Sequence, residues 1–346
     1  MFARKEKPLP VAVLKPPPTH NTRTTEGEGI HLGEGYYWNP STLPNSHIVA
    51  IGASGSGKTQ TLKAIAFSLH QTYPQMQIIL LDFHGDQEIV GETCYPIHMA
   101  SPHGINPLVV NLDPIRYLLK EHHPGETVET RYYDHLADWQ DLIKLENYLI
   151  QIHQPPLNQT TLRTECKDSQ KLKLKLAATF QYGVFSRPQP ELSENLVRID
   201  LSKLPPSLAA LSAESLAAQL MNQHRLKGEI QGRLPRTFLF IDEAKEMPKT
   251  EGSACDRIIA DGRKYGLSLV LASQSERHLS QDVIGNSATK IVLPVDQTEV
   301  NKVAKKFRFA EKKVASLTPL TALCRFGKEA ELLEIQPYYQ RIKNAQ

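Results

Sequence analysis

The chain has 346 residues, of which 40% are hydrophobic and 22% charged, a composition typical of a soluble globular protein. Its net charge of +3 is too small to indicate a polyanionic partner. Its four cysteines lie far apart without a C-x-x-C pair, which argues against a structural zinc site or a disulfide framework and suits a reducing cytoplasm. No apolar run approaches about 18 residues and the N-terminus lacks an apolar segment, so we expect a cytoplasmic protein without a transmembrane helix or signal peptide.

The N-terminal third of the chain begins with a predicted arm and continues into a strand, a loop and a helix. Residues 1–28 are rich in proline, lysine, arginine and threonine, which predicts a flexible basic arm. From Ile30 the pattern becomes strand-like, and the apolar run Ile48–Ile51 predicts a buried strand. A helical pattern begins at Thr59 and places four apolar residues on one face: Leu62, Ile65, Ala66 and Leu69.

Between this strand and this helix lies an octapeptide of the form G-x-x-x-x-G-K-[ST], the Walker A pattern or P-loop. Its members are Gly52, Ala53, Ser54, Gly55, Ser56, Gly57, Lys58 and Thr59. Glycines let the backbone wrap a phosphate chain, so that successive N–H groups point at it. Lys58 is expected to reach the β- and γ-phosphates, and the Thr59 hydroxyl to ligate Mg²⁺. The sequence therefore predicts a nucleoside triphosphate site.

Four further apolar runs, each ending in polar residues, predict the strands Ile78–Asp82, Phe238–Ile241, Leu269–Ser273 and Ile291–Val295. They are continuous rather than alternating, as expected for a parallel sheet that is covered on both faces. The carboxyl ends of such strands meet at one edge of the sheet, where ligands bind. The expected fold is therefore α/β with a mostly parallel sheet.

Two helices are predicted among the later strands. One spans Ala254–Tyr265 and ends at Gly266, a plausible C-terminal cap. The other begins after Asp296 and Glu299, which resemble a capping box, and has four apolar residues on one face: Val300, Val303, Ala304 and Phe307.

We divide the chain around an insertion. Residues 29–110 form the first part of the nucleotide-binding core, and residues 191–346 form the second part with the C-terminal segment. Residues 111–190 are polar, aromatic and helix-leaning, and we interpret them as a helical insertion packed over the core.

Polar residues after two of the strands are the candidate catalytic groups. Asp242 and Glu243 follow four apolar residues in a Walker B pattern, in which Asp242 would hold the Mg²⁺ shell. Glu243 would act as general base toward the attacking water. Gln274 ends the next strand and could sense the γ-phosphate and orient the water.

The segment Asp82-Phe83-His84-Gly85 raises an alternative, because D-x-x-G is also a GTPase switch pattern. A GTPase should then contain N-K-x-D for the guanine. The Asn301-Lys302 pair lacks that aspartate and lies in a predicted helix, so ATP is the expected nucleotide.

The order of motifs resembles the HerA–FtsK superfamily of ATPases, and most closely its HerA-like branch. The resemblance covers about residues 30–338. It is carried by the segments at 47–51, 81–86, 105–108, 199–202, 240–244, 262–266, 271–274 and 286–292, among them Gly262-Arg263-Lys264-Tyr265-Gly266 and Leu271-Ala272-Ser273-Gln274.

This resemblance implies a RecA-like, additional-strand P-loop core and a hexameric ring with ATP bound between subunits. Lys58 and Thr59 match the Walker A pair, Asp242 and Glu243 the Walker B pair, and Gln274 the sensor glutamine. Arg263 becomes the best candidate for an arginine finger, a cation that stabilises the transferred phosphoryl group from a neighbouring subunit.

Three functions follow as hypotheses. The first is an ATP-driven DNA translocase or helicase that threads DNA through a ring, with a partner nuclease or effector protein. The second is an ATPase of the secretion or conjugation type that moves protein or nucleoprotein. The third is an ATP-dependent assembly subunit of a defence or mobile-element complex.

Overall fold

A computed structural model describes residues 28–105, 181–185, 187–247 and 252–345. The expected arm and most of the expected helical insertion, which begins at residue 111, lie outside the described residues. Within the described part of the chain, no helix combines the length and the apolar character needed to cross a membrane.

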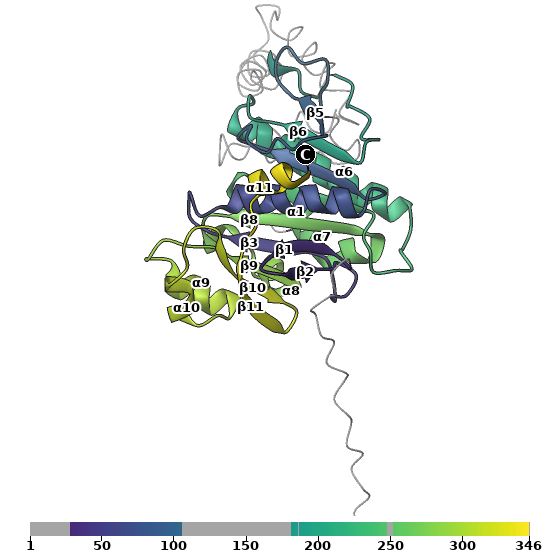
Figure 1. Ribbon diagram of the computed structural model, residues 1–346. Coiled ribbons are helices and arrows are strands. Elements are labelled where there is room, and N and C mark those ends of the chain that lie inside the picture. The colour runs from purple at the N-terminus through teal and green to yellow at the C-terminus, as the bar shows by residue number, and fades with distance from the viewer. Residues whose placement is uncertain (1–27, 106–180, 186, 248–251, 346) are drawn as a thin grey trace, which may run out of the picture.

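The core is a nine-stranded sheet with the order β11-β10-β9-β3-β8-β7-β4-β6-β5 (Figure 1). All five predicted strands are confirmed as its central strands, running parallel: β9 (Thr289–Val292), β3 (Ile48–Ile51), β8 (Leu267–Ser273), β7 (Thr237–Ile241) and β4 (Gln77–Asp82). One strand, β8, separates the P-loop strand β3 from the Walker B strand β7. This confirms the expected α/β fold with a mostly parallel sheet.

Four strands that the apolar pattern did not predict extend the sheet at both edges. On one side β6 (Leu196–Asp200) and β5 (Thr93–Pro96) continue the parallel sheet beyond β4. On the other side β10 (Thr321–Phe326) and β11 (Glu329–Glu334) form an antiparallel hairpin beside β9. In β11 only Leu333 is buried, so the strand lacks the continuous apolar run by which the central strands are recognised.

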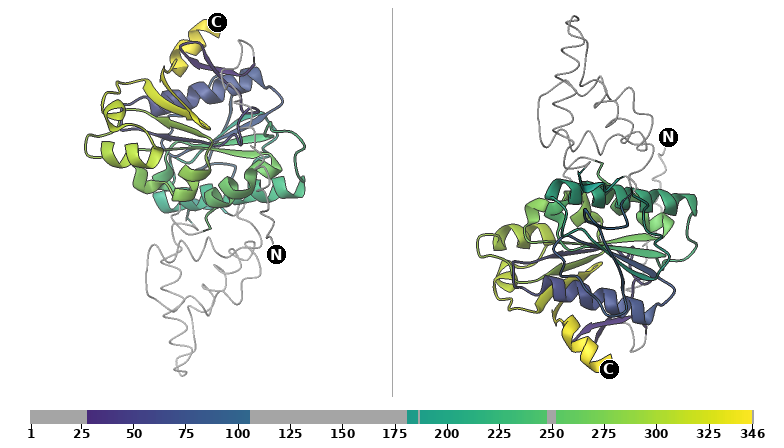
Figure 2. Two further views of the ribbon diagram at one scale, coloured as in Figure 1. Left: turned by 90° about the horizontal axis from the view of Figure 1, so that it is seen from below. Right: turned by 90° about the horizontal axis from the view of Figure 1, so that it is seen from above.

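Helices cover both faces of the sheet, which explains why its central strands are apolar on both sides (Figure 2). One face packs against α1 (Lys58–Thr72), α11 (Tyr338–Ala345) and a small antiparallel pair, β1 (Ile30–Gly33) and β2 (Tyr36–Trp38). The four apolar residues predicted for the inner face of α1 are all buried.

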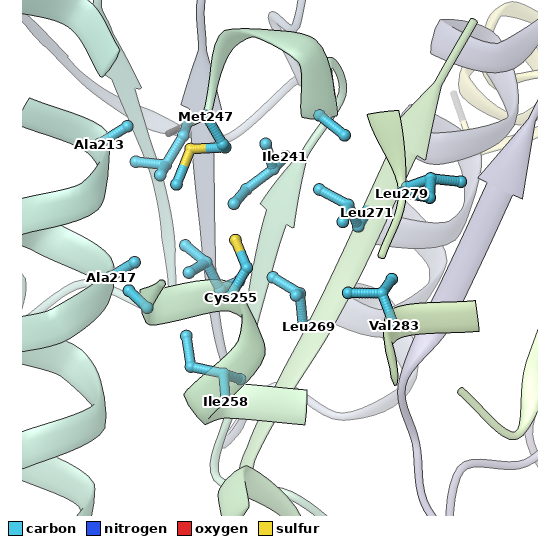
Figure 3. Close-up of a cluster of buried hydrophobic side chains, with 14 of the residues drawn as sticks. Ala213, Ala217, Ile241, Met247, Cys255, Ile258, Leu269, Leu271, Leu279 and Val283 are labelled. Atoms are coloured by element: carbon cyan, nitrogen blue, oxygen red, sulfur yellow. The ribbon is translucent and has the colours of Figure 1, made fainter. Parts of the chain in front are cut away.

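The other face packs mainly against α6 (Pro206–Leu226) and α7 (Ala254–Tyr265). Short helices complete this layer: α8 (Gln281–Asn286), α9 (Val300–Phe307) and α10 (Glu311–Ala315). Two single-turn segments, η1 (Ala244–Glu246) and η2 (Glu276–His278), follow β7 and β8. Figure 3 shows the packing between α6, α7, α8 and the sheet, with Ala217, Ile258, Leu269 and Val283 in one cluster.

The two helix predictions have different outcomes. The prediction for α7 is confirmed, and Gly266 caps it in the left-handed conformation with a φ of 75°. The apolar face of α9 is also confirmed, but the capping box is wrong because no side chain caps the helix. The Asp296 carboxylate accepts bonds from the Thr298 backbone and hydroxyl, while Glu299 accepts from Ser275 and Lys302.

Candidate functional site

The phosphate loop runs between β3 and α1 and is held by neighbouring strand ends. The Gly52 N–H donates to the Ser273 carbonyl (3.2 Å) and the Ala53 N–H to the Pro294 carbonyl (2.7 Å). Gly57 has a φ of 100°, in the left-handed region that favours glycine. A Cβ at Gly52 would lie 2.5 Å from the Ser56 Oγ, so the loop closes only with glycine there. This backbone fits a phosphate cradle in front of the N-terminus of α1.

Lys58 is the first residue of α1 and lies over the loop. Its Nζ donates to the Ala53 carbonyl at 3.2 Å, and 8% of the residue is exposed. Burial lowers the pKa of Lys58, and the carboxylates of Asp242 and Glu243 oppose that shift. A buried ammonium close to two carboxylates and the loop is well placed to bind the terminal phosphates of a nucleotide.

The Walker A threonine and the Walker B aspartate meet across the sheet edge. Thr59 Oγ1 donates to Asp242 Oδ2 at 2.7 Å, although 183 residues separate them in sequence. Burial raises the pKa of Asp242, against the lowering effect of the Thr59 hydrogen bond. The second oxygen, Asp242 Oδ1, is buried and lacks a hydrogen-bond partner among the described residues.

These oxygens fit a Mg²⁺ site that shares its coordination with a nucleotide. Among the described residues there is no group of three His, Cys, Asp or Glu side chains that could hold a metal ion. Mg²⁺ prefers oxygen ligands and is usually bound by one or two protein groups together with water and phosphate oxygens. Thr59 Oγ1 and the unpartnered oxygen of Asp242 meet this requirement.

Glu243 lies next to the sensor candidate. Gln274 Nε2, at the end of β8, donates to Glu243 Oε2 at 2.8 Å. Only 3% of Glu243 is exposed, and its Oε1 is buried without a partner among the described residues. The free oxygen is thus available to accept a hydrogen bond from water, while the amide of Gln274 fixes the orientation of the carboxylate.

Gln87 was not singled out by the sequence, yet it contacts the same aspartate. Its Nε2 donates to Asp242 Oδ2 at 2.5 Å and to Asp86 Oδ1 at 3.1 Å, and the side chain is buried. The only sequence signal was its place directly after Asp82–Asp86, a segment that the family resemblance had marked. Gln87 therefore helps to orient the aspartate together with Thr59, which donates to the same oxygen.

The D-x-x-G segment forms a turn that is held together by hydrogen bonds to the side chain of Asp82. Asp82 Oδ1 accepts from the N–H groups of His84 and Gly85, and Asp82 Oδ2 accepts from the N–H of Gln87. Arg198 on β6 donates to the same Oδ2. Because these bonds occupy the carboxylate, Asp82 positions the loop that carries Gln87.

Arg198 is expected to be the main electrostatic support of this loop. It is 8% exposed and bonds Asp82 at 3.0 Å and Glu92 at 2.7 Å. Arg198→Met would leave two buried carboxylates uncompensated, so we expect the free energy of unfolding to fall by about 3–5 kcal/mol in urea denaturation.

The matched control is Arg225→Met, which breaks a pair with Asp261 of similar length (2.7 Å) on the surface. Its expected effect is about 0–1 kcal/mol because both side chains are solvated. Equal losses in the two variants would contradict the structural role of Arg198.

Arg263 lies away from the other candidates. It is exposed on the last turn of α7, which leads into the start of β8. His47, directly before β3, lies close to this turn, because a Cβ added to Gly262 would lie 3.5 Å from His47 Cε1. Burial and then the charge of Arg263 lower the pKa of His47 to about 4. The start of β3 is the edge of the sheet opposite the phosphate loop, so the structure does not bring Arg263 to the loop of its own chain.

Three other basic side chains near these strands have acidic partners. Arg257 lies 3.9 Å from Glu214, Lys264 2.8 Å from Glu229, and Arg277 3.4 Å from Glu299. Lys264 and Glu229 are both exposed, whereas Glu214 and Glu299 are mostly buried and pair with basic groups that reach the surface.

No protein-family model and no curated protein matches the sequence. Solved structures do share its fold. VirB4 of Thermoanaerobacter pseudethanolicus superposes with a TM-score of 0.68 at 15% identity, over 90% of this chain and 97% of that one. The plasmid coupling protein TrwB in complex with ADP and Mg²⁺ gives a TM-score of 0.59 at 17% identity, over 91% of each chain.

The chain therefore has the RecA-like P-loop fold of VirB4 and the coupling protein TrwB, as the family resemblance predicted. At 15–17% sequence identity, the similarity to these structures establishes the fold alone.

Proposed function

We propose that this chain is a Mg²⁺-dependent ATPase of the conjugation or secretion type, which moves protein or nucleoprotein. One arrangement carries the proposal: Thr59 with Asp242, and Glu243 with Gln274, meet beside a glycine-rich phosphate loop. The fold supports the same class, because VirB4 and the conjugative coupling protein TrwB share it. TrwB was solved with ADP and Mg²⁺, which supports the same ligands here.

In the proposed reaction, Glu243 accepts a proton from water as the water oxygen bonds to the γ-phosphorus. The bond from that phosphorus to the ADP oxygen breaks, and ADP and phosphate are released. Lys58 and the N–H groups of the loop balance the charge on the phosphates, and Gln274 holds Glu243 in place. Thr59 and Asp242 would hold Mg²⁺, which would supply Lewis-acid neutralisation of the phosphate oxygens.

We further propose that the active unit is a hexameric ring of the HerA–FtsK type. The position of Arg263 supports this, because an exposed arginine remote from its own phosphate loop is suited to reach a neighbour's loop. Its segment, Gly262–Gly266, is one of those that carry the resemblance to the HerA-like branch.

DNA translocation or unwinding is the second candidate function. An exposed basic edge runs along α9 to the residue that caps it, and consists of Lys302, Lys305 and Arg308. Such an edge is chemically suited to phosphate contacts. A third reading, an ATP-dependent assembly subunit, requires no transported polymer.

One experiment separates the DNA motor from the other two functions: the ATPase rate measured alone and with single- or double-stranded DNA, at two salt concentrations. Strong stimulation that weakens with salt would favour a DNA motor, because phosphate contacts are screened by counterions. ATP hydrolysis without DNA stimulation at either salt concentration would favour the conjugation or secretion type or the assembly subunit. Absence of ATP binding would refute the ATPase itself.

A further inference from the structure

The turn before β10 lies directly on the phosphate loop. The Leu320 N–H donates to the Ser56 carbonyl at 3.1 Å. The Leu320 side chain covers Gly57, since a Cβ added to that glycine would lie 2.6 Å from Leu320 Cδ2. The Leu320 carbonyl accepts from the Ile335 N–H, which ties the turn to the end of β11. A residue more than 260 positions away from the loop thus contacts it with both backbone and side chain.

Leu320 adopts a conformation that leucine rarely adopts. Its φ is 66°, in the left-handed region, whereas glycine or asparagine is the usual residue there. The turn is closed by the Thr321 N–H and the Thr318 carbonyl, with Pro319 before Leu320. This is the pattern of a type II turn, in which the third position normally requires glycine. Strained residues of this kind cluster at functional sites.

The bond to Ser56 has a geometric consequence for the cradle. A trans peptide is planar, so the C=O of Ser56 and the N–H of Gly57 point in opposite directions. Because Leu320 holds the carbonyl on its own side, the Gly57 N–H is aimed to the other side of the loop. Gly57 is the residue directly before α1, where backbone N–H groups bind phosphate.

We propose that Leu320 is a positioning residue of the phosphate cradle: its N–H orients the Ser56–Gly57 peptide, and its side chain covers Gly57. Binding of the nucleotide phosphates then depends on the turn Thr318–Thr321 and, through Ile335, on the end of the β10–β11 hairpin. The inference rests on the proposed function, since it assigns a role within the same nucleotide site.

The test compares Leu320→Gly, which suits the positive φ and keeps the N–H, with Leu320→Met, which keeps a side chain of similar size. We expect Leu320→Gly to weaken ATP and ADP binding about tenfold in calorimetry, while its melting temperature stays near that of the wild type. In ¹⁵N-glycine-labelled protein, ADP should shift the Gly57 amide resonance strongly in the wild type and weakly in Leu320→Gly. Leu320→Met should restore both the affinity and the shift.

Leu317→Ala is the control for a purely structural effect, because Leu317 lies in the same connection but packs against the hydrophobic core. Its melting temperature should fall while its Gly57 resonance still responds to ADP. Wild-type affinity and a wild-type Gly57 shift in Leu320→Gly would overturn this inference and leave the proposed function standing. A wild-type protein that binds neither nucleotide would instead refute the proposed function.

Discussion

Glu243→Gln is expected to retain ATP binding and to lose turnover, with a rate about 10²–10⁴ times lower than that of the wild type. The carboxylate is buried, and one of its oxygens accepts from Gln274 while the other has no partner among the described residues. An amide of the same shape keeps the contact with Gln274 but accepts a proton from water very poorly. The measurements are single-turnover hydrolysis and the dissociation constant for ATP.

Glu246→Gln is the matched control for this variant. Glu246 is a carboxylate three residues further along, and its partner is Lys245 at 3.6 Å. Replacing this carboxylate by an amide should leave the rate of ATP hydrolysis nearly unchanged. Unchanged hydrolysis in Glu243→Gln would remove Glu243 from the role of general base.

Arg263→Ala is expected to lower the ATPase rate by about 10³–10⁵, the usual contribution of an arginine finger. Arg263 lies at the sheet edge opposite the phosphate loop, so we expect it to act on the neighbouring subunit. Lys264→Ala is the control, because Lys264 is an exposed cation on the same turn of α7 whose partner is Glu229.

Mixed rings test whether Arg263 acts between subunits. Arg263→Ala and Lys58→Ala should each be nearly inactive alone. In mixed rings, some sites combine an intact Lys58 with a neighbour's intact Arg263, about one in four for random assembly. Recovery of activity to that level is the expected result. A mixture that stays as inactive as its components would contradict the assignment to a neighbouring subunit.

Much of the fold was predictable because its signals are local. The central strands are recognisable as continuous apolar runs, since a parallel sheet covered by helices buries both faces of each strand. The end of α7 was predictable because Gly266 takes a left-handed conformation that suits glycine. The edge strands were not predictable, because β11 buries a single side chain and carries no such pattern.

The candidate site was predictable only where its residues share a sheet edge. Each of four side chains follows a parallel strand or the loop after it, so the neighbouring strands bring them to one edge of the sheet. They are Thr59, Asp242, Glu243 and Gln274. The capping-box prediction, which failed, involved Glu299. Its carboxylate contacts Ser275 after β8 and a lysine on its own helix, so the chain segments packed around it decided its partners.

The sequence by itself determined the phosphate loop and the parallel sheet, because glycine conformations and apolar runs express local backbone and burial requirements. Only the tertiary structure decided that Gln87 contacts Asp242, that Leu320 holds the Ser56 peptide, and that Arg263 lies at the opposite edge. Those relationships depend on the order of strands in space. A strand order carries no local signal, because residues far apart in sequence become neighbours only when the sheet assembles.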